Sequence, residues 1–199
     1  TPGAPLPSAG SAPAYSSTTR QEAAVDESDL VKTNGLTIYS FGEPLGGADA
    51  TTLQAHQRNA DGSLTEISKI KLGSASSYQS PHGLLLTPDS KRLLSLRSQD
   101  YYNYSAPTCA ADGMCVPSYM IVDRNIGLDL FDTNSNGSLG ASTQVEVQGH
   151  LIASRMIGNT AVLVTSHYPR LQVELLQTQQ ERDAALNNLT ATEILPSVR

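Results

Sequence analysis

The feature that most constrains the fold of this chain is an Asx-Gly turn that occurs twice in nearly the same surroundings. The sequence Asn-Ala-Asp-Gly-Ser-Leu at 59–64 is matched by Asn-Ser-Asn-Gly-Ser-Leu at 134–139, a shift of 75 residues. The glycine of such a pair supplies the positive φ that a tight β-hairpin needs. Alternating apolar and polar residues precede both turns, at 52–57 and 127–131. The pattern predicts antiparallel hairpins repeated along the chain.

Each turn is followed by the same succession of strands. These segments are 67–72, 83–87 and 92–96 after the first turn, and 145–148, 151–153 and 160–164 after the second. Four antiparallel strands per unit are typical of a β-propeller blade, whose usual period is about 40–50 residues. We attribute the longer shift to an insertion at 100–117. The alternative is an antiparallel sandwich in which the two turns coincide by chance.

The expected fold class is therefore all-β, with propeller blades of four antiparallel strands. The expected units are a Pro/Ala/Ser-rich tether at 1–24, a propeller region at 25–199, a first blade at 28–72, a second at 80–148, a third that begins at about 151, and a helical insertion at 170–195. Propellers close with about 4–8 blades. About two and a half blades predict the N-terminal portion of a larger propeller, whose open edge pairs with a missing C-terminal part or another chain.

The helical insertion is predicted from two capping boxes. Thr178 precedes Glu181 by three residues, and Thr190 precedes Glu193 by the same spacing. In this pattern the threonine and the carboxylate satisfy backbone N–H groups that the first helical turn leaves unpaired. Two short helices are expected there.

Two motifs resemble a known family. One is Val-Asp-Glu-Ser-Asp-Leu-Val-Lys-Thr-Asn-Gly at 25–35, and the other is Ser-Arg-Met-Ile-Gly at 154–158. They resemble two motifs of secreted bacterial and archaeal β-propeller proteins that are distantly related to WD-repeat propellers. The two motifs follow one another in the same order as in that family. The resemblance implies the propeller fold. It implies no activity, because that family has no generally established one.

Composition restricts the partners and the compartment. The net charge is −6, with only 13 Lys and Arg, which disfavours nucleic acid or an anionic membrane surface as partner. No apolar run reaches the roughly 18–20 residues that cross a bilayer. The uncharged segment 1–19, rich in Pro, Ala and Ser, is typical of a tether that follows an export signal. We expect a secreted or periplasmic protein, with a lipid anchor in the envelope as one form of the tether.

The only two cysteines, Cys109 and Cys115, flank an Asp-Gly turn. Their spacing suits a small disulfide loop in an oxidising compartment. The alternative is a metal-binding or redox pair, for which a Cys-x-x-Cys spacing and further ligands nearby are expected.

A cluster of carboxylates is the first candidate site. Asp26, Glu27 and Asp29 offer three oxygen donors to a hard cation such as Ca²⁺. The alternative is a structural role, in which they pair with Lys32 and with backbone amides where the first blade begins. The run Asp-x-Asn-x-Asn-Gly at 132–137 imitates half of a calcium loop, but it lacks the final glutamate and is predicted to be a hairpin.

His82 is the second candidate. It lies in Ser-Pro-His-Gly at 80–83, which is similar to a phrase of lactonase-like propellers, and the resemblance implies a metal or acid–base role. The alternative is a structural hydrogen bond. The other histidines, His56, His150 and His167, have no second ligand at a metal-binding spacing, so the sequence supports no zinc site.

Arg155 and three tyrosines complete the candidates. Arg155 either faces an anionic ligand in the channel or joins two blades through Asp26 or Asp29. Tyr101, Tyr102 and Tyr104 lie in the predicted insertion, where aromatic side chains supply contact area.

The sequence contains no nucleophilic serine motif, phosphate loop or dinucleotide fingerprint. It therefore favours a binding or scaffolding module of the cell envelope, for a protein, peptide or polysaccharide. The alternative is a metal-assisted hydrolase of the lactonase-like kind, with His82 and a carboxylate such as Asp26 near a channel ion.

Overall fold

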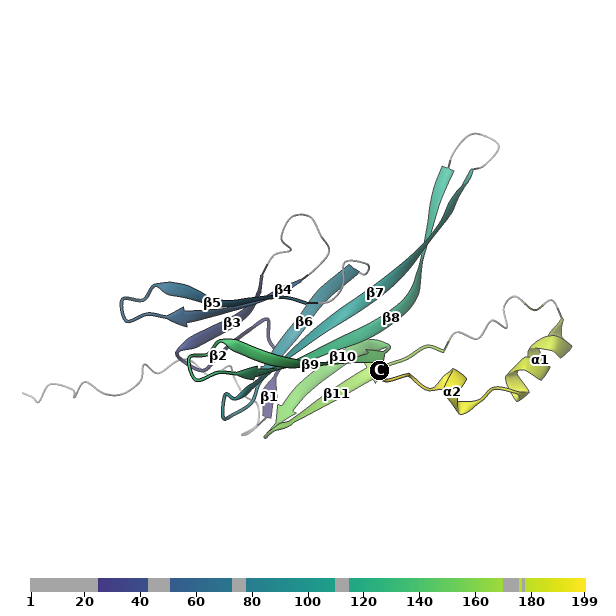
Figure 1. The fold of residues 1–199 in the computed structure, drawn as a ribbon. Coiled ribbons are helices and arrows are strands. Elements are labelled where there is room, and N and C mark those ends of the chain that lie inside the picture. The colour runs from purple at the N-terminus through teal and green to yellow at the C-terminus, as the bar shows by residue number, and fades with distance from the viewer. Residues whose placement is uncertain (1–24, 43–50, 73–77, 110–114, 170–175, 177) are drawn as a thin grey trace, which may run out of the picture.

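The computed structural model describes residues 25–42, 51–72, 78–109, 115–169, 176 and 178–199, and the side chains at 78, 101–109 and 115–123 lie outside the description. The described part consists of antiparallel sheets of three or four strands, followed by two short helices (Figure 1). The expected all-β class, with a helical segment near the C-terminus, is confirmed.

The strands form three sheets. Apart from β1, which joins the last sheet, the strands of each sheet are consecutive in the sequence, and we number the sheets in that order. The first sheet has the order β2-β3-β4-β5, with β2 (Val31–Thr33), β3 (Thr37–Gly42), β4 (Thr52–Arg58) and β5 (Leu64–Lys71). The second has the order β6-β7-β8-β9, with β6 (Tyr78–Leu86), β7 (Arg92–Cys109), β8 (Cys115–Thr133) and β9 (Leu139–Gln148). The third has the order β1-β10-β11, with β1 (Val25–Glu27), β10 (His150–Ile157) and β11 (Thr160–Ser166). Consecutive strands within the first two sheets are hydrogen-bonded neighbours, as in a propeller blade.

The two Asx-Gly sequences form equivalent turns, as predicted. Gly62 joins β4 to β5 with φ 85°, and Gly137 joins β8 to β9 with φ 84°. In both turns the first asparagine donates its N–H to the carbonyl of the serine four residues later, at 2.9 Å. The asparagine side chain also donates to that serine's hydroxyl at 2.9 Å in each turn. The repeat in the sequence is therefore a repeat of hydrogen bonds.

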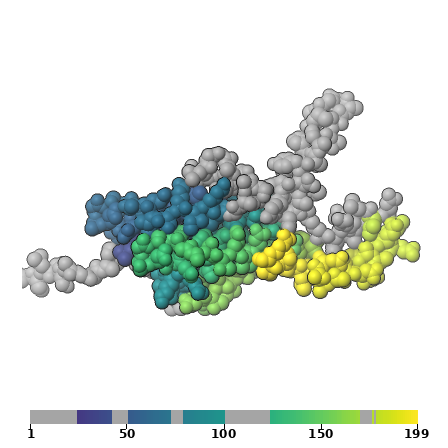
Figure 2. Space-filling model, viewed as in Figure 1, coloured from purple at the N-terminus to yellow at the C-terminus, as the bar shows by residue number. Residues whose placement is uncertain are grey.

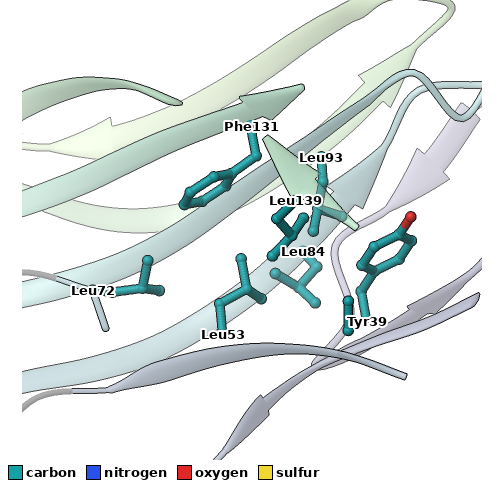
Figure 3. Close-up of a cluster of buried hydrophobic side chains, with 8 residues drawn as sticks. Tyr39, Leu53, Leu72, Leu84, Leu93, Phe131 and Leu139 are labelled. Atoms are coloured by element: carbon teal, nitrogen blue, oxygen red, sulfur yellow. The ribbon is translucent and has the colours of Figure 1, made fainter. Parts of the chain in front are cut away.

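The second sheet is buried on both faces. Leu84 and Leu93 point into a cluster shared with the first sheet, whereas Leu85 and Leu94 point into a cluster shared with the third. The first cluster is drawn in Figure 3; its buried members are Tyr39, Leu53, Ala55, Leu72, Leu84, Leu93, Phe131 and Leu139. Successive residues of a strand face opposite sides of the sheet, so consecutive leucines can fill both clusters.

Strands β7 and β8 continue well past their neighbours. The last pair that joins β6 to β7 is Tyr78 with Asp100, and the last that joins β9 to β8 is Gln148 with Asn125. Beyond these points, within the described residues, β7 and β8 pair only with each other, as far as Cys109 and Cys115. This two-stranded ribbon (101–109 and 115–123) extends away from the sheets (Figure 1). The sequence predicts an insertion between strands at 100–117; instead, the two strands themselves continue through it.

The two predicted helices follow the last strand near the C-terminus. They are α1 (Gln179–Asn187) and α2 (Ala191–Ile194). Thr178 and Glu181 form the reciprocal capping box of α1, and the Glu193 carboxylate accepts the Thr190 N–H at 2.8 Å. Neither helix buries a residue, and Figure 2 shows them in yellow at one end of the molecule. Among the described residues no helix is long and apolar enough to span a membrane.

Candidate functional site

The segment 25–33, here called the junction segment, contacts all three sheets. Its first part is β1, whose Glu27 pairs with Arg155 of β10 in the third sheet. Asp29 then exchanges two backbone hydrogen bonds with Leu84 of β6 in the second sheet, at 3.2 and 2.7 Å. Its last part is β2, the first strand of the first sheet. One continuous run of nine residues therefore holds the three sheets together.

The middle of the junction segment packs so closely against β6 that position 83 has no room for a side chain. A Cβ atom on Gly83 would lie 2.8 Å from the Cβ of Ser28 and 3.0 Å from its hydroxyl. Ser28 in turn accepts a hydrogen bond from the buried Ser154 hydroxyl of β10 at 2.7 Å. Glycine at position 83 thus allows the segment to pass directly across the second sheet.

The candidate carboxylates of this segment take part in local structural contacts. Both oxygens of Asp26 accept hydrogen bonds from Lys32 Nζ, at 3.0 and 2.9 Å. Lys32 is buried and also donates to the Glu27 carbonyl oxygen at 2.6 Å. Asp29 Oδ1 accepts the Leu30 N–H at 2.7 Å. These are the contacts expected of the structural alternative to a Ca²⁺ site.

Arg155 lies on β10, opposite Glu27 of the junction segment. Its Nη2 is 3.2 Å from Glu27 Oε1, and both side chains are more than half exposed. The arginine therefore bridges β10 to β1 through Glu27, whereas the sequence suggested either an anionic ligand in the channel or a bridge through Asp26 or Asp29. Within the described part of the chain, no three His, Cys, Asp or Glu side chains come close enough to hold a metal ion.

His82 meets a partner that the sequence did not indicate. Its ring centre lies 6.1 Å from that of His150, with the rings at 76° in an edge-on arrangement. Burial, and to a lesser extent the neighbouring His150, lower the pKa of His82, while Asp100 opposes this shift. The Nδ1 atom of His150 is buried and has no hydrogen-bond partner. The two histidines lie on different sheets, so no short spacing in the sequence could have revealed the pair.

A buried polar cluster of the second sheet, on the face toward the first sheet, was missed altogether. Arg97 of β7 is fully buried, and its Nε donates to Asp129 Oδ2 at 2.8 Å. Its Nη1 donates to the side-chain oxygens of Gln79 and Gln99, at 3.0 and 3.2 Å. Gln144 donates to the other oxygen of Asp129 at 3.0 Å. The charges of the pair are compensated in place, which is the condition under which charged groups are tolerated in a core.

Glycine again makes this arrangement possible. Gly127 is the cross-strand partner of Arg97, and a Cβ atom there would lie 2.5 Å from the Arg97 Cζ. The guanidinium therefore lies directly against the bare backbone of β8. The sequence did contain a signal for this cluster. Along β7, Ser95, Arg97 and Gln99 alternate with Leu94 and Leu96, so the polar residues lie on the same face as Leu93, and the two leucines lie on the other face.

The tyrosines and cysteines fall on the ribbon, where only the backbone is described. Tyr101, Tyr102 and Tyr104 belong to β7, so they do not lie on a loop, and their side chains are outside the description. Cys109 and Cys115 are directly opposed in the last described pair of the ribbon. Cross-strand neighbours have Cα atoms about 4.5–5.5 Å apart, within the range of a disulfide. The bond itself stays a prediction, because the two side chains are outside the description.

The hydrolase alternative finds no support in this geometry. It placed His82 and a carboxylate such as Asp26 near a channel ion, but the Asp26 carboxylate binds Lys32, the His82 ring lies against His150, and no group of three possible metal ligands occurs among the described residues.

Comparison with known proteins agrees with the architecture. A family model described as "Beta propeller domain" matches residues 15–199, which is most of the chain. No curated protein and no solved structure matches the chain. The three consecutive antiparallel sheets, packed face to face through two apolar clusters, have the arrangement of propeller blades. The chain belongs to the Beta propeller domain family.

Proposed function

We propose that this β-propeller domain is a binding or scaffolding module that holds a protein, peptide or polysaccharide through the β7–β8 ribbon. The observation that carries the proposal is the ribbon itself, which continues past the last pairs that β6 and β9 make with it. It places Tyr101, Tyr102 and Tyr104 on a strand beyond the body of the second blade. Tyrosine supplies a large contact area with few rotatable bonds and a polar hydroxyl, which suits both peptide and sugar partners.

The scaffolding part of the proposal rests on the third blade. Its β10–β11 face opposite the second blade presents four apolar side chains that are 43–61% exposed: Ile152, Ile157, Val162 and Val164. The second blade, by contrast, packs against a neighbouring sheet on both faces. Several exposed apolar side chains on one face of a sheet are typical of a contact surface. We propose that another β-sheet covers this face, from a further part of the propeller or from another chain.

The compartment is also part of the proposal. We place the domain outside the cytoplasm, secreted or in the periplasm, with or without a lipid anchor. The support is the cross-strand position of Cys109 and Cys115, the only cysteines of the chain. A disulfide there would join the two strands of a ribbon that no third strand supports in the described residues.

The binding role is tested with glycan and peptide arrays probed by the tag-free chain. A ligand found in this way is then titrated against the triple variant Tyr101→Ala, Tyr102→Ala and Tyr104→Ala. We expect at least a roughly tenfold loss of affinity, because aromatic anchors dominate such contacts. The matched control is Tyr168→Ala, an exposed tyrosine outside the ribbon, which should bind unchanged. Equal affinity of the triple variant and the control would reject the ribbon as the binding element.

A further inference from the structure

We propose that His82 and His150 form a binding site for a borderline-soft divalent cation such as Zn²⁺, Ni²⁺ or Cu²⁺, which would join the second blade to the third. This site is distinct from the carboxylates of the junction segment, and it does not depend on the ribbon. It uses two residues from separate blades, so the bound ion would act at the seam between them.

Two irregularities of the backbone bring the imidazoles together. The register of β6 on β7 shifts between Pro81 and Gly83, which leaves His82 as the extra residue of a β-bulge. Bulges of this kind re-aim a side chain away from the regular ladder. His150 follows Gly149, whose φ of 123° few other residues adopt, and whose N–H donates to the Arg124 carbonyl at 2.7 Å. Each ring is therefore positioned by a local departure from regular strand geometry.

The distance between the rings brings them within reach of a shared metal ion. With metal–nitrogen bonds of about 2.0–2.1 Å, two imidazoles on one ion hold their ring centres about 5 Å apart at a tetrahedral angle and about 6.3 Å apart when they lie on opposite sides of the ion. The observed separation is 6.1 Å with the rings edge-on, so binding at a tetrahedral angle requires side-chain rotations that bring the ring centres about 1 Å closer. The buried His150 Nδ1 has no hydrogen-bond partner. A nitrogen in that condition is destabilising unless it is satisfied, and metal coordination at the pair offers one way to orient and satisfy the ring.

The donor atoms select the class of ion. Imidazole nitrogen suits Zn²⁺, Ni²⁺ and Cu²⁺, whereas Ca²⁺ requires six to eight oxygen ligands. Asp100 lies near enough to influence His82, and its carboxylate is held by Arg124 Nε at 2.8 Å. No third His, Cys, Asp or Glu joins the pair within the described residues, so water completes the coordination shell. We therefore expect weaker binding than at four-ligand structural zinc sites.

The test is calorimetric titration of the tag-free chain with ZnCl₂, and separately with CaCl₂. We expect one Zn²⁺ per chain and no Ca²⁺ at this site. The variants His82→Ala and His150→Ala should each weaken Zn²⁺ binding by at least roughly tenfold, because each removes half of the protein ligands. The matched control is His56→Ala on β4 of the first blade, which should leave binding unchanged.

A second measurement on the unaltered chain covers the case in which a variant fails to fold. Substoichiometric Ni²⁺ should broaden the imidazole resonances of His82 and His150 in NMR spectra, but not those of His56. Broadening that spares His82 and His150, an absence of Zn²⁺ binding, or binding that survives either folded variant would overturn the proposal.

Discussion

The buried Arg97–Asp129 pair gives a direct test of what stabilises the second blade. Arg97→Met keeps much of the length of the side chain but removes the guanidinium. It leaves the Asp129 carboxylate, which is 7% exposed, without its cation, and removes a hydrogen-bond donor from Gln79 and Gln99. Breaking a buried ion pair by removing one partner costs about 3–5 kcal/mol. At about 2–4 °C per kcal/mol for a chain of this size, the melting temperature should fall by roughly 6–20 °C.

The assays are thermal and urea unfolding, both followed by far-UV circular dichroism because the chain contains no tryptophan. Arg92→Met is the matched control, since Arg92 lies on the same strand and pairs with Asp132 at 3.5 Å. Both side chains of that pair are more than 60% exposed, so its removal should cost less than about 1 kcal/mol.

A double variant separates the ion pair from its packing. Arg97→Met with Asp129→Leu removes both charges, so no carboxylate is left unpaired. The double variant should be more stable than Arg97→Met alone, because replacing both members of a buried pair by apolar groups is often neutral or favourable. Equal losses in Arg97→Met and Arg92→Met, or a double variant less stable than Arg97→Met, would refute this reasoning.

Three further predictions concern the seams and the ribbon. Gly83→Ala should lower the unfolding free energy by about 1–3 kcal/mol, because the new methyl group would meet the Ser28 Cβ at 2.8 Å. Urea denaturation measures this loss, and a negligible loss would contradict the prediction. Cys109 and Cys115 should be joined, so intact mass after alkylation without reductant should show no modified thiol; two alkylated thiols would exclude the bond. Because the pKa of His82 is lowered in the folded protein, mainly by burial, the unfolded state binds the extra proton first as the pH falls. The metal-free chain should therefore lose stability below about pH 6.5, which is the pKa of an unperturbed histidine. The change in unfolding free energy with pH should be shallower in His82→Gln. Identical urea midpoints across pH for the two proteins would contradict this.

The features that were predictable from the sequence are local ones. Asp61-Gly62 and Asn136-Gly137 determine their turns through φ and through hydrogen bonds within five residues. The capping box of Thr178 and Glu181 is likewise complete within four residues. The alternation of leucines with polar residues then predicts which strands have buried faces, so the blade architecture follows from short-range patterns.

The features that were missed depend on contacts between distant segments. Nothing in Val25–Glu27 reveals that it pairs with β10 instead of opening the first blade. The partner of His82 is His150, which lies on another blade. Arg97 was passed over because a charged residue in a strand is normally read as exposed, whereas here Gly127 makes room for it on a buried face. The ribbon was read as an insertion because its two strands, among the described residues, pair only with each other.

The junction segment also has a consequence for biogenesis. Strand β1 leaves the ribosome before its partner on β10, which follows about 130 residues later. At roughly 5–20 residues per second, β1 waits some 7–25 s for that partner. The first blade can assemble in that interval from neighbouring hairpins, but the pairing that ties it to the third blade forms only afterwards. We therefore expect β1 to dock after the first blade has assembled, and a nascent chain stalled before His150 would carry β1 unpaired and accessible to chaperones or proteases.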